Sequence, residues 1–452
     1  MARKTVDMTN GPIMSRLIVF IIPLILSSLL QQLYNTADMI VAGRFIGANA
    51  LAAIGATGSL YNLIINFING LAAGASTVVA QNQGAKDTEA VHRSVHTSIA
   101  IAIIGGCLIA VVGNIICRPM LEFMETPAEV IDQSELYLRI FFAASPVTMI
   151  YNFGAAILRA KGDSKRPLYI LGVTGLVNVV LNVIFVIGFG MGVEGVAIPT
   201  VIAQALSAIM AVSCLMKDDT HFKLIPSKIR IWKDQLKRLI LIGLPVGIQS
   251  TLFSVTNVMI QSSINSLGAM AMAGSAAKSK ITMLTEVMFT SVNQACSVFC
   301  GQNFGAKKYR RMIKVMLCCA LLGTVISLTT CPLALIFGRQ LLSFFTTESE
   351  AIERGMEALT VLALTMVLES YMSIMSSSLR SMNKSFVSMF NVLLCVITIR
   401  IYWVLVYFPT HRTMTQLFIS YPVTWVVTTI MQVICFTYFY KKLIKEENKS
   451  AS

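Results

Sequence analysis

The chain alternates long apolar segments with short polar stretches. Twelve segments are each about 20 residues or longer and almost uncharged, long enough to cross a hydrocarbon core of about 30 Å as helices. Membrane-spanning strands would instead alternate apolar and polar residues over short segments. The pattern therefore predicts an all-α polytopic membrane protein with twelve transmembrane helices, at residues 15–42, 52–80, 94–117, 136–158, 168–190, 193–216, 236–265, 273–300, 313–337, 356–379, 385–409 and 415–440.

The apolar pattern occurs twice, with a shift of 221 residues. The run Gln81-Asn82-Gln83-Gly84-Ala85-Lys86 recurs as Gln302-Asn303-Phe304-Gly305-Ala306-Lys307, and Leu158-Arg159 recurs as Leu379-Arg380. Because each half has an even number of helices, the two repeats share one orientation. We expect two pseudo-symmetric six-helix bundles: an N-lobe at residues 1–216 (helices 1–6), a cytoplasmic linker at 217–235, a C-lobe at 236–441 (helices 7–12) and a cytoplasmic tail at 442–452.

The charges along the chain indicate how it crosses the membrane. The chain is 55% hydrophobic and only 13% charged, which is too apolar for one soluble core. Its net charge of +14 comes mostly from Lys and Arg residues in the even-numbered loops and both termini, which the positive-inside rule places in the cytoplasm. This excess indicates topology and not nucleic-acid binding. We expect a multi-pass protein of the bacterial cytoplasmic membrane with both termini in the cytoplasm.

The sequence offers little for metal, cofactor or enzyme chemistry. All ten cysteines lie in or beside apolar segments, where they suit packing. His92 and His96 stand one helical turn apart beside a basic loop, and we expect a solvated helix start there. The sequence has no phosphate-binding loop and no recognisable nucleophile constellation. We therefore expect no enzyme activity, no metal and no cofactor, with an ion gradient or the substrate's own gradient as the energy source.

Three acidic residues stand well inside the predicted helices: Asp38, Glu286 and Glu369. A charged acid at mid-bilayer costs about 2.5–3.5 kcal/mol, so it must face protein or water and is a candidate functional residue. Repeat symmetry does not require these acids, because their counterparts in the other half are Met259, Ile65 and Thr148. The alternative is an acid held in a structural ion pair, for instance with Arg400 or Lys280.

A buried acid at this depth suits ion coupling. Burial favours the neutral form of a carboxyl group, which would let a proton gradient load and unload it. Asp38 lies late in a helix that leaves the cytoplasm, so we expect it in the outer half of the membrane. There it could hold a proton or a cationic substrate, and competition would couple the two fluxes. Pro23 and Pro245, in equivalent helices, mark either bending sites or static kinks.

Several motifs in register carry a resemblance to a known family. They include Asp38-Met39-Ile40-Val41-Ala42-Gly43, Gly195-Val196-Ala197-Ile198-Pro199-Thr200 and the repeated runs above. With these motifs the whole chain resembles the MATE (multidrug and toxic compound extrusion) transporters, nearest to their prokaryotic DinF-like and MepA-like members. The resemblance implies two lobes around a central cleft. It also implies a secondary active antiporter that exports amphipathic, cationic drugs or toxins in exchange for H+ or Na+.

The resemblance further implies an ion site in the N-lobe. In the family a cation site surrounds the helix 1 aspartate, which matches Asp38. A helix 5 pattern Asn-x-x-x-Asp falls on Asn178 and Asn182, and a helix 6 threonine matches Thr200. Since Asn182 replaces an aspartate, we expect weaker cation binding and a simpler protonation switch at Asp38.

In the C-lobe the chain departs from the sodium site of NorM-like members. Glu369 matches an acid of the sodium site in NorM-like members and is expected as a second coupling residue, but the helix 7 acid of that site is missing here. The expected partners are small cationic molecules and the lipid bilayer, with the protein as a monomer. The alternatives are a lipid-linked oligosaccharide flippase, a channel or a membrane-embedded enzyme. Residues of a possible substrate or second ion site are Glu286, Tyr34, Tyr151 and Tyr371.

Overall fold

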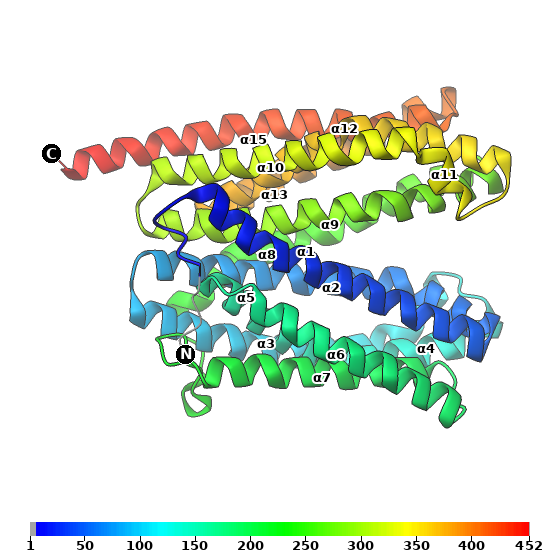
Figure 1. The fold of residues 1–452 in the computed structure, drawn as a ribbon, viewed down its shortest axis with the longest axis horizontal. Helices are drawn as coiled ribbons and strands as arrows, with labels where there is room; N and C mark the ends of the chain where they lie inside the picture. The colour runs from blue at the N-terminus through cyan, green and yellow to red at the C-terminus, as the bar shows by residue number, and fades with distance from the viewer. Residues whose placement is uncertain (1–5, 452) are drawn as a thin grey trace. The chain divides into compact units, whose positions relative to one another are not determined.

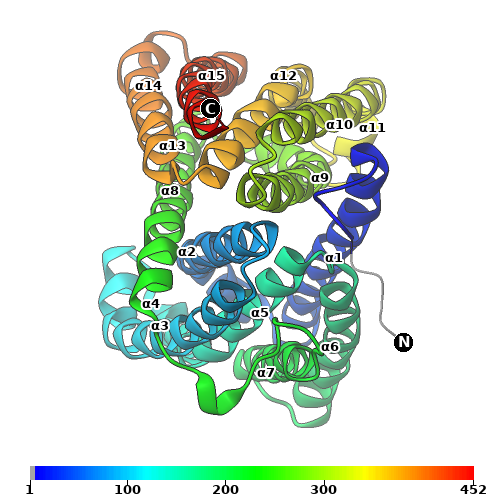
Figure 2. The same cartoon turned by 90° about the vertical axis from the view of Figure 1, so that its left-hand side faces the viewer.

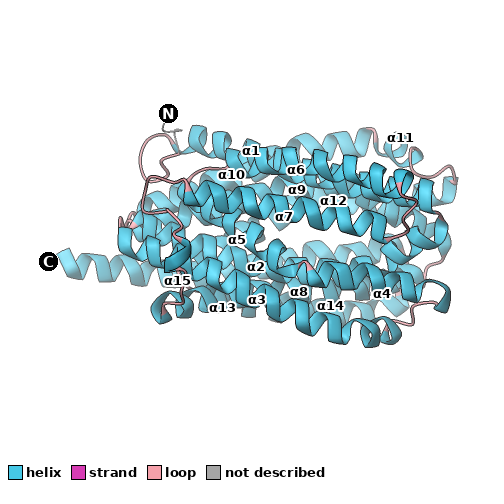
Figure 3. Cartoon of the chain, turned by 90° about the horizontal axis from the view of Figure 1, so that it is seen from below, coloured by secondary structure: helices cyan, strands magenta, loops and turns pink. Residues whose placement is uncertain are grey.

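The computed structural model describes residues 6–451, which form helices and loops with no strand (Figures 1 and 3). The first half contains α1 (Ile13–Val41), α2 (Ala48–Gly84), α3 (Thr88–Phe123), α4 (Ala128–Ala143), α5 (Ser145–Lys161), α6 (Lys165–Val183) and α7 (Glu194–Met216). The second half contains α8 (Lys233–Asn265), α9 (Ala269–Gly305), α10 (Tyr309–Ile336), α11 (Gly338–Ser343), α12 (Ser349–Ser381), α13 (Ser385–Val392), α14 (Thr398–Tyr402) and α15 (Met414–Ala451). Short π-helical turns lie at Ala42–Ile46, Ile184–Gly188, Leu393–Ile397 and Trp403–Tyr407, and short 3-10 turns at Pro226–Lys228 and Phe408–Thr410.

The helices have the length and composition of membrane spans. Within the described residues ten helices are long and apolar enough to cross a membrane, and the bent pair α4–α5 makes an eleventh. The helix α9 covers the predicted span 273–300, but Lys278, Lys280 and Glu286 interrupt its apolar sequence. The prediction of an all-α polytopic membrane protein is confirmed.

The chain divides into two compact units. Unit 1 contains Val19–Gly247 with the described residues before Met8, and unit 2 contains Met8–Ile18 with the chain from Ile248 onward. In unit 1, α5 packs against α2, α3 and α7 (Figures 1 and 2). In unit 2, α12 packs against α9, α10 and α15. The unit boundaries fall inside α1 and α8, the helices that contain Pro23 and Pro245. The predicted lobe boundaries stay a prediction.

The backbone follows the sequence repeat at its turns. Gly47 and Gly268, with φ of 124° and 95°, stand before α2 and α9. Lys86 and Lys307 follow the next helix end with φ of 59° and 57°. The third pair, 162 and 383, has Gly in the first half at φ 99° and Asn in the second at φ 61°. All three pairs keep the shift of 221, so the two halves share turn geometry as well as sequence.

The fourth predicted span, residues 136–158, is wrong in its shape. It consists of α4 and α5, which meet at Ala144 with a bend of 50°. Pro146 stands in the first turn of α5, where its missing N–H and fixed φ favour a new helix start over a continued helix. The backbone of Gly106 in α3 approaches closely there, since a methyl group on it would lie 2.4 Å from the Cα of Pro146.

The linker is attached to unit 1 by specific bonds. The N–H of Ile225 donates to Nε2 of His96 over 3.0 Å, and Nδ1 of His96 lies 2.8 Å from the carbonyl oxygen of His92. This pattern requires a neutral imidazole with its proton on Nδ1. His96 is fully buried, so the expectation of a solvated helix start is wrong for this residue. The covering linker is a long-range feature that the local sequence does not reveal.

The C-terminal region continues as helix. The predicted tail 442–452 is part of α15 as far as Ala451, and its last residue lies outside the described residues.

Candidate functional site

Asp38 lies near the end of α1, just before the π-helical turn Ala42–Ile46. Such turns are rare within helices and occur often at functional sites. The Asp38 side chain is half-buried. Its carboxylate is therefore held by protein groups on one side.

Two of the predicted partners donate to this carboxylate, and a third donates to one of them. The amide of Asn182 donates to Oδ1 of Asp38, and the hydroxyl of Thr200 donates to Oδ2 over 3.3 Å. The amide of Asn178 donates to the Thr200 oxygen over 3.0 Å. The structure thus brings together all four residues expected at the N-lobe site, from α1, α6 and α7, while their role in ion coupling stays a prediction.

The spacing of these residues explains how they reach one site. Asn178 and Asn182 are four residues apart, so they share a face of α6, and both are buried. Thr200 follows Pro199, the proline inside α7, and its hydroxyl also bonds the carbonyl of Val196 over 3.0 Å. Each helix therefore contributes polar atoms to one small region.

Two oxygen atoms in this region have no hydrogen-bond partner. They are the side-chain carbonyl oxygens of Asn178 and Asn182, and both are buried. Together with the Asp38 carboxylate they form a set of oxygen acceptors, which is the donor type that a hard cation prefers. A proton on Asp38 or a monovalent cation held by these oxygens would fit the residues present.

A short polar chain of Gln204, Thr148 and Tyr61 lies next to this region in unit 1. Gln204 stands one turn after Thr200 on α7, accepts from the Thr148 hydroxyl and lies 3.5 Å from the Tyr61 hydroxyl. Tyr61 in turn feels the charge of Asp38. Sequence reasoning missed Gln204, and the only available signal was that Thr148 is the repeat counterpart of Glu369.

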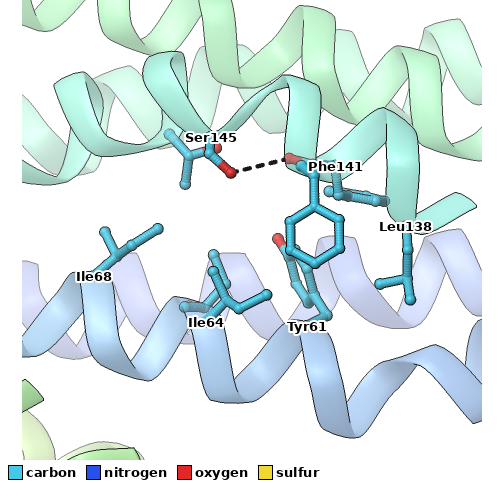
Figure 4. A pocket seen from close by; sticks show the side chains of 9 residues that line it. Tyr61, Ile64, Ile68, Leu138, Phe141 and Ser145 are labelled. Atoms are coloured by element: carbon cyan, nitrogen blue, oxygen red, sulfur yellow. Dashed lines mark hydrogen bonds between the residues drawn. The ribbon is translucent and has the colours of Figure 1, made fainter. Parts of the chain in front are cut away.

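A small pocket lies beside this chain (Figure 4). The Tyr61 ring packs edge to face against Phe141, with the ring centroids 4.7 Å apart. The Ser145 hydroxyl donates to the Phe141 carbonyl over 3.4 Å. The lining is otherwise mostly aliphatic, so the pocket suits packing or a single water better than a drug-sized molecule. Its lining residues are Tyr61, Ile64, Ile65, Ile68, Leu138, Phe141, Phe142, Ser145 and Thr148.

The acids of unit 2 stand in a different setting. Glu369 on α12 is half-buried and feels the charges of Glu286 and Arg400. Glu286 on α9 is exposed and accepts from the Thr282 hydroxyl over 3.3 Å. Among the residues that the structure describes, neither acid forms a direct ion pair with a basic side chain. The alternative of a locked ion pair with Arg400 or Lys280 is therefore not seen in this geometry.

The candidate tyrosines do not gather into one cluster. Tyr34 donates to the carbonyl of Gly172 over 3.3 Å, and its ring covers Gly175. The Tyr371 hydroxyl lies 2.7 Å from that of Thr324 in unit 2. Tyr151 on α5 feels the charge of Arg159. Their predicted part in substrate binding stays a prediction.

Unit 2 also buries Lys278 and Arg400 against aromatic rings, and neither has a direct carboxylate partner among the described residues. Lys278 on α9 lies with Nζ 4.6 Å from the ring centroid of Phe418. Arg400 on α14 lies with Cζ 4.2 Å from the ring centroid of Tyr421. Aromatic faces on α15 thus stabilise both cations. Sequence reasoning named Arg400 only as a possible ion-pair partner.

Known proteins are similar to this chain in sequence. The MatE family model matches residues 23–184 and again 245–406, one match in each half. The chain is 30% identical over 370 residues to the "Probable multidrug resistance protein YoeA" of Bacillus subtilis, covering 80% of each chain. It is 21% identical over 365 residues to the "Multidrug export protein MepA" of Staphylococcus aureus, covering 79% of each.

Solved structures share the fold across nearly the whole length. One is an outward-facing multidrug resistance MATE family transporter of the MOP superfamily, with a TM-score of 0.89 and 22% identity, over 98% of this chain and 99% of that one. Another is a MOP superfamily transporter from Pyrococcus furiosus, also with a TM-score of 0.89 and 22% identity over the same shares.

Proposed function

The chain belongs to the MATE family of membrane transporters, and we propose that it is a secondary active antiporter that exports amphipathic, cationic drugs or toxins in exchange for H+ or Na+. The names of its relatives as multidrug resistance and export proteins support the substrate class. We place it in the bacterial cytoplasmic membrane with both termini in the cytoplasm, as the distribution of Lys and Arg indicates.

The observation that supports ion exchange is the setting of Asp38. An acid in a spanning helix has two hydrogen-bond donors, Asn182 and Thr200, and two unsatisfied oxygens nearby. The donors stabilise the carboxylate, and the free oxygens could join it around a cation. Asp38 is the residue proposed to take up the coupling ion.

Exchange then follows from differential binding. A ligand shifts a conformational equilibrium only by its difference in affinity for the two states. If the Asp38 carboxylate binds its ion more tightly in one state and the substrate binds more tightly in the other, ion entry drives substrate exit. Protonation of Asp38 would also weaken the hydrogen bond that it accepts from the Asn182 amide, because a neutral acid is a weaker acceptor than a carboxylate. The hydrogen bonds between α1 and α6 would then change with the bound ion.

The test is ethidium efflux from proteoliposomes. A proton gradient and a sodium gradient are imposed separately on the parent, on Asp38→Asn and on the control Asp219→Asn, which alters an exposed acid of the linker. We expect one gradient to drive efflux in the parent and the control, with a loss of at least about tenfold in Asp38→Asn.

Two results would count against this proposal. Normal efflux by Asp38→Asn would remove Asp38 from the mechanism and leave Glu369 as the remaining candidate. A parent that moves ethidium under neither gradient would argue against cation export itself, and transport of a lipid-linked oligosaccharide would then be the next assay.

A further inference from the structure

Unit 2 contains a counterpart of the Asp38 site. In unit 1 that site is built by α1, α6 and α7. The sequence repeat relates these helices to α8, to the segment α13–α14 and to α15. The segments α6 and α13 both begin after a residue with positive φ, Gly162 at 99° and Asn383 at 61°. The two segments therefore start in register.

A π-helical turn then shifts this register by one residue. The turn Leu393–Ile397 lies between α13 and α14, whereas α6 is regular as far as Val183. A π turn holds one more residue than an α turn, since its bonds run from i to i+5. The shift of 221 becomes 222 beyond it, and the counterpart of Arg400 is Asn178. Arg400 therefore stands where unit 1 has an amide of the proposed ion site.

Arg400 contacts α8 and α15, which are the counterparts of two helices of the Asp38 site, α1 and α7. Its Nη1 donates to the Thr256 hydroxyl and to the side-chain oxygen of Asn257 on α8, both over 3.3 Å. Its guanidinium stacks over Tyr421 on α15, with 4.2 Å from Cζ to the ring centroid. At the repeat shift of 221, Tyr421 on α15 is the counterpart of Thr200 on α7. The positive charge lies among the counterparts of the helices that surround Asp38.

The charge of Arg400 is permanent, because guanidinium does not lose its proton in proteins. The side chain is 2% exposed, and its Nε has no partner. Glu369 on α12 feels this charge without a direct ion pair in the described chain. Glu286 and Lys278 also interact electrostatically with each other, so two basic and two acidic side chains balance in this region.

We propose that Arg400 is a tethered cation that takes, in unit 2, the place of the exchangeable ion beside Asp38 in unit 1. The inference rests on the proposed ion exchange at Asp38. Glu369 then balances a fixed charge instead of binding its own proton or sodium, and only unit 1 exchanges an ion. Each transport cycle then exchanges one coupling ion at the two sites together, because Arg400 occupies the second site permanently.

The experiment counts exchangeable ions on the purified transporter, independently of transport. Equilibrium binding of radioactive sodium measures bound sodium, and the infrared carbonyl band of protonated carboxyl groups measures bound protons during a pH titration. The variants are Asp38→Asn, Glu369→Gln, Arg400→Asn, Arg400→Lys and the double variant Arg400→Asn with Glu369→Gln.

We expect one ion in the parent, lost in Asp38→Asn and kept in Glu369→Gln and Arg400→Lys. Arg400→Asn should bind a second ion, and the double variant should return to one. Loss of an ion in Glu369→Gln alone would overturn the inference, as would a folded Arg400→Asn with a single ion. If Arg400→Asn does not fold, the number of ions bound by Glu369→Gln decides whether Glu369 binds an exchangeable ion. If Asp38→Asn binds as many ions as the parent, the proposed function is refuted instead, whether or not Arg400→Asn binds an additional ion.

Discussion

At the residue scale, the neighbours of Asp38 decide what it can bind. Asn182 offers an amide donor where the family pattern has an acid, so one negative charge is available instead of two. Two unit charges about 4 Å apart interact by about 4 kcal/mol at an effective dielectric constant of about 20. A single substitution at this position should therefore change cation affinity strongly.

Asn182→Asp should raise sodium affinity by at least about tenfold, because a second carboxylate would stand beside Asp38 and share the cation. Equilibrium binding of radioactive sodium measures this. The control Asn182→Leu removes the hydrogen bond without adding charge and should not raise affinity. Equal sodium affinity in the parent and Asn182→Asp would mean that these side chains do not form a cation site.

A second residue-scale prediction concerns Asp218 in the linker. It is buried, pairs with Lys161 and accepts from the N–H of Thr220 over 2.9 Å. Burial alone would raise the pKa of Asp218, but the hydrogen bonds from Lys161 and Thr220 hold it below its usual value. Because the folded state then favours the carboxylate, this residue stabilises the protein above the ordinary pKa of about 3.9 and less as the pH falls toward its folded pKa.

Asp218→Asn should lower the free energy of unfolding by about 3 kcal/mol at pH 7, since it leaves the Lys161 ammonium without its partner. Thermal unfolding in detergent at a series of pH values measures this. The difference from the parent should be constant above about pH 5 and shrink as the pH falls below about 4. A difference that does not shrink would show that the charge of Asp218 has no part in its effect.

At the element scale, α2 and the first part of α8 meet through glycines. A methyl group on Gly74 would lie 2.3 Å from the Cα of Gly243, and one on Gly70 would lie 2.4 Å from the Cα of Gly247. Arg238, near the start of α8, also donates to the side chains of Gln81 and Asn82 on α2, both over 2.7 Å. The repeated Gln-Asn motif thus stabilises a helix contact in unit 1.

Gly74→Ala should destabilise the protein by more than about 2 kcal/mol, because backbone atoms of α8 would have to move. The matched control is Gly172→Ala in α6, where a methyl group meets nothing within 4 Å. That change should be neutral or stabilise by up to about 1 kcal/mol, as expected for alanine in a helix. Thermal unfolding compares the two, and similar melting temperatures would show that α2 and α8 are not in close contact.

At the scale of the whole molecule, two similar halves carry different chemistry. Unit 1 contains an acid with oxygen-rich surroundings, and unit 2 contains acids balanced by buried basic groups. The repeat accounts for shared turns, whereas these polar residues differ between the halves. One repeated arrangement of helices therefore supports two electrostatic settings.

Topology gives the whole-molecule prediction. In intact cells a membrane-impermeant thiol reagent should label Glu348→Cys, in the acidic loop before α12, and should label Asp219→Cys only after permeabilisation. The positive-inside rule places the first position outside and the second in the cytoplasm. The parent, with its ten native cysteines, is the control for background labelling. The reverse pattern would invert the proposed orientation.

Features that depend on residues close along the chain follow from the amino-acid sequence alone. The lengths of the apolar segments predicted an all-α membrane protein, because a helix must satisfy its backbone within the bilayer. The shift of 221 predicted two similar halves. Asp38 stood out because an acid is costly in an apolar helix. Asn178, Asn182 and Thr200 came from the family resemblance, and the structure places them beside it.

Features that depend on packing between distant segments emerge only in the folded protein. The linker buries His96, Gln204 meets Thr148 across helices, and Arg400 stacks on Tyr421. The backbone of Gly106 in α3 likewise lies against Pro146 at the bend between α4 and α5. The burial and the hydrogen bonds of a side chain depend on the segment that packs against it. The composition of its own helix does not reveal which segment that is.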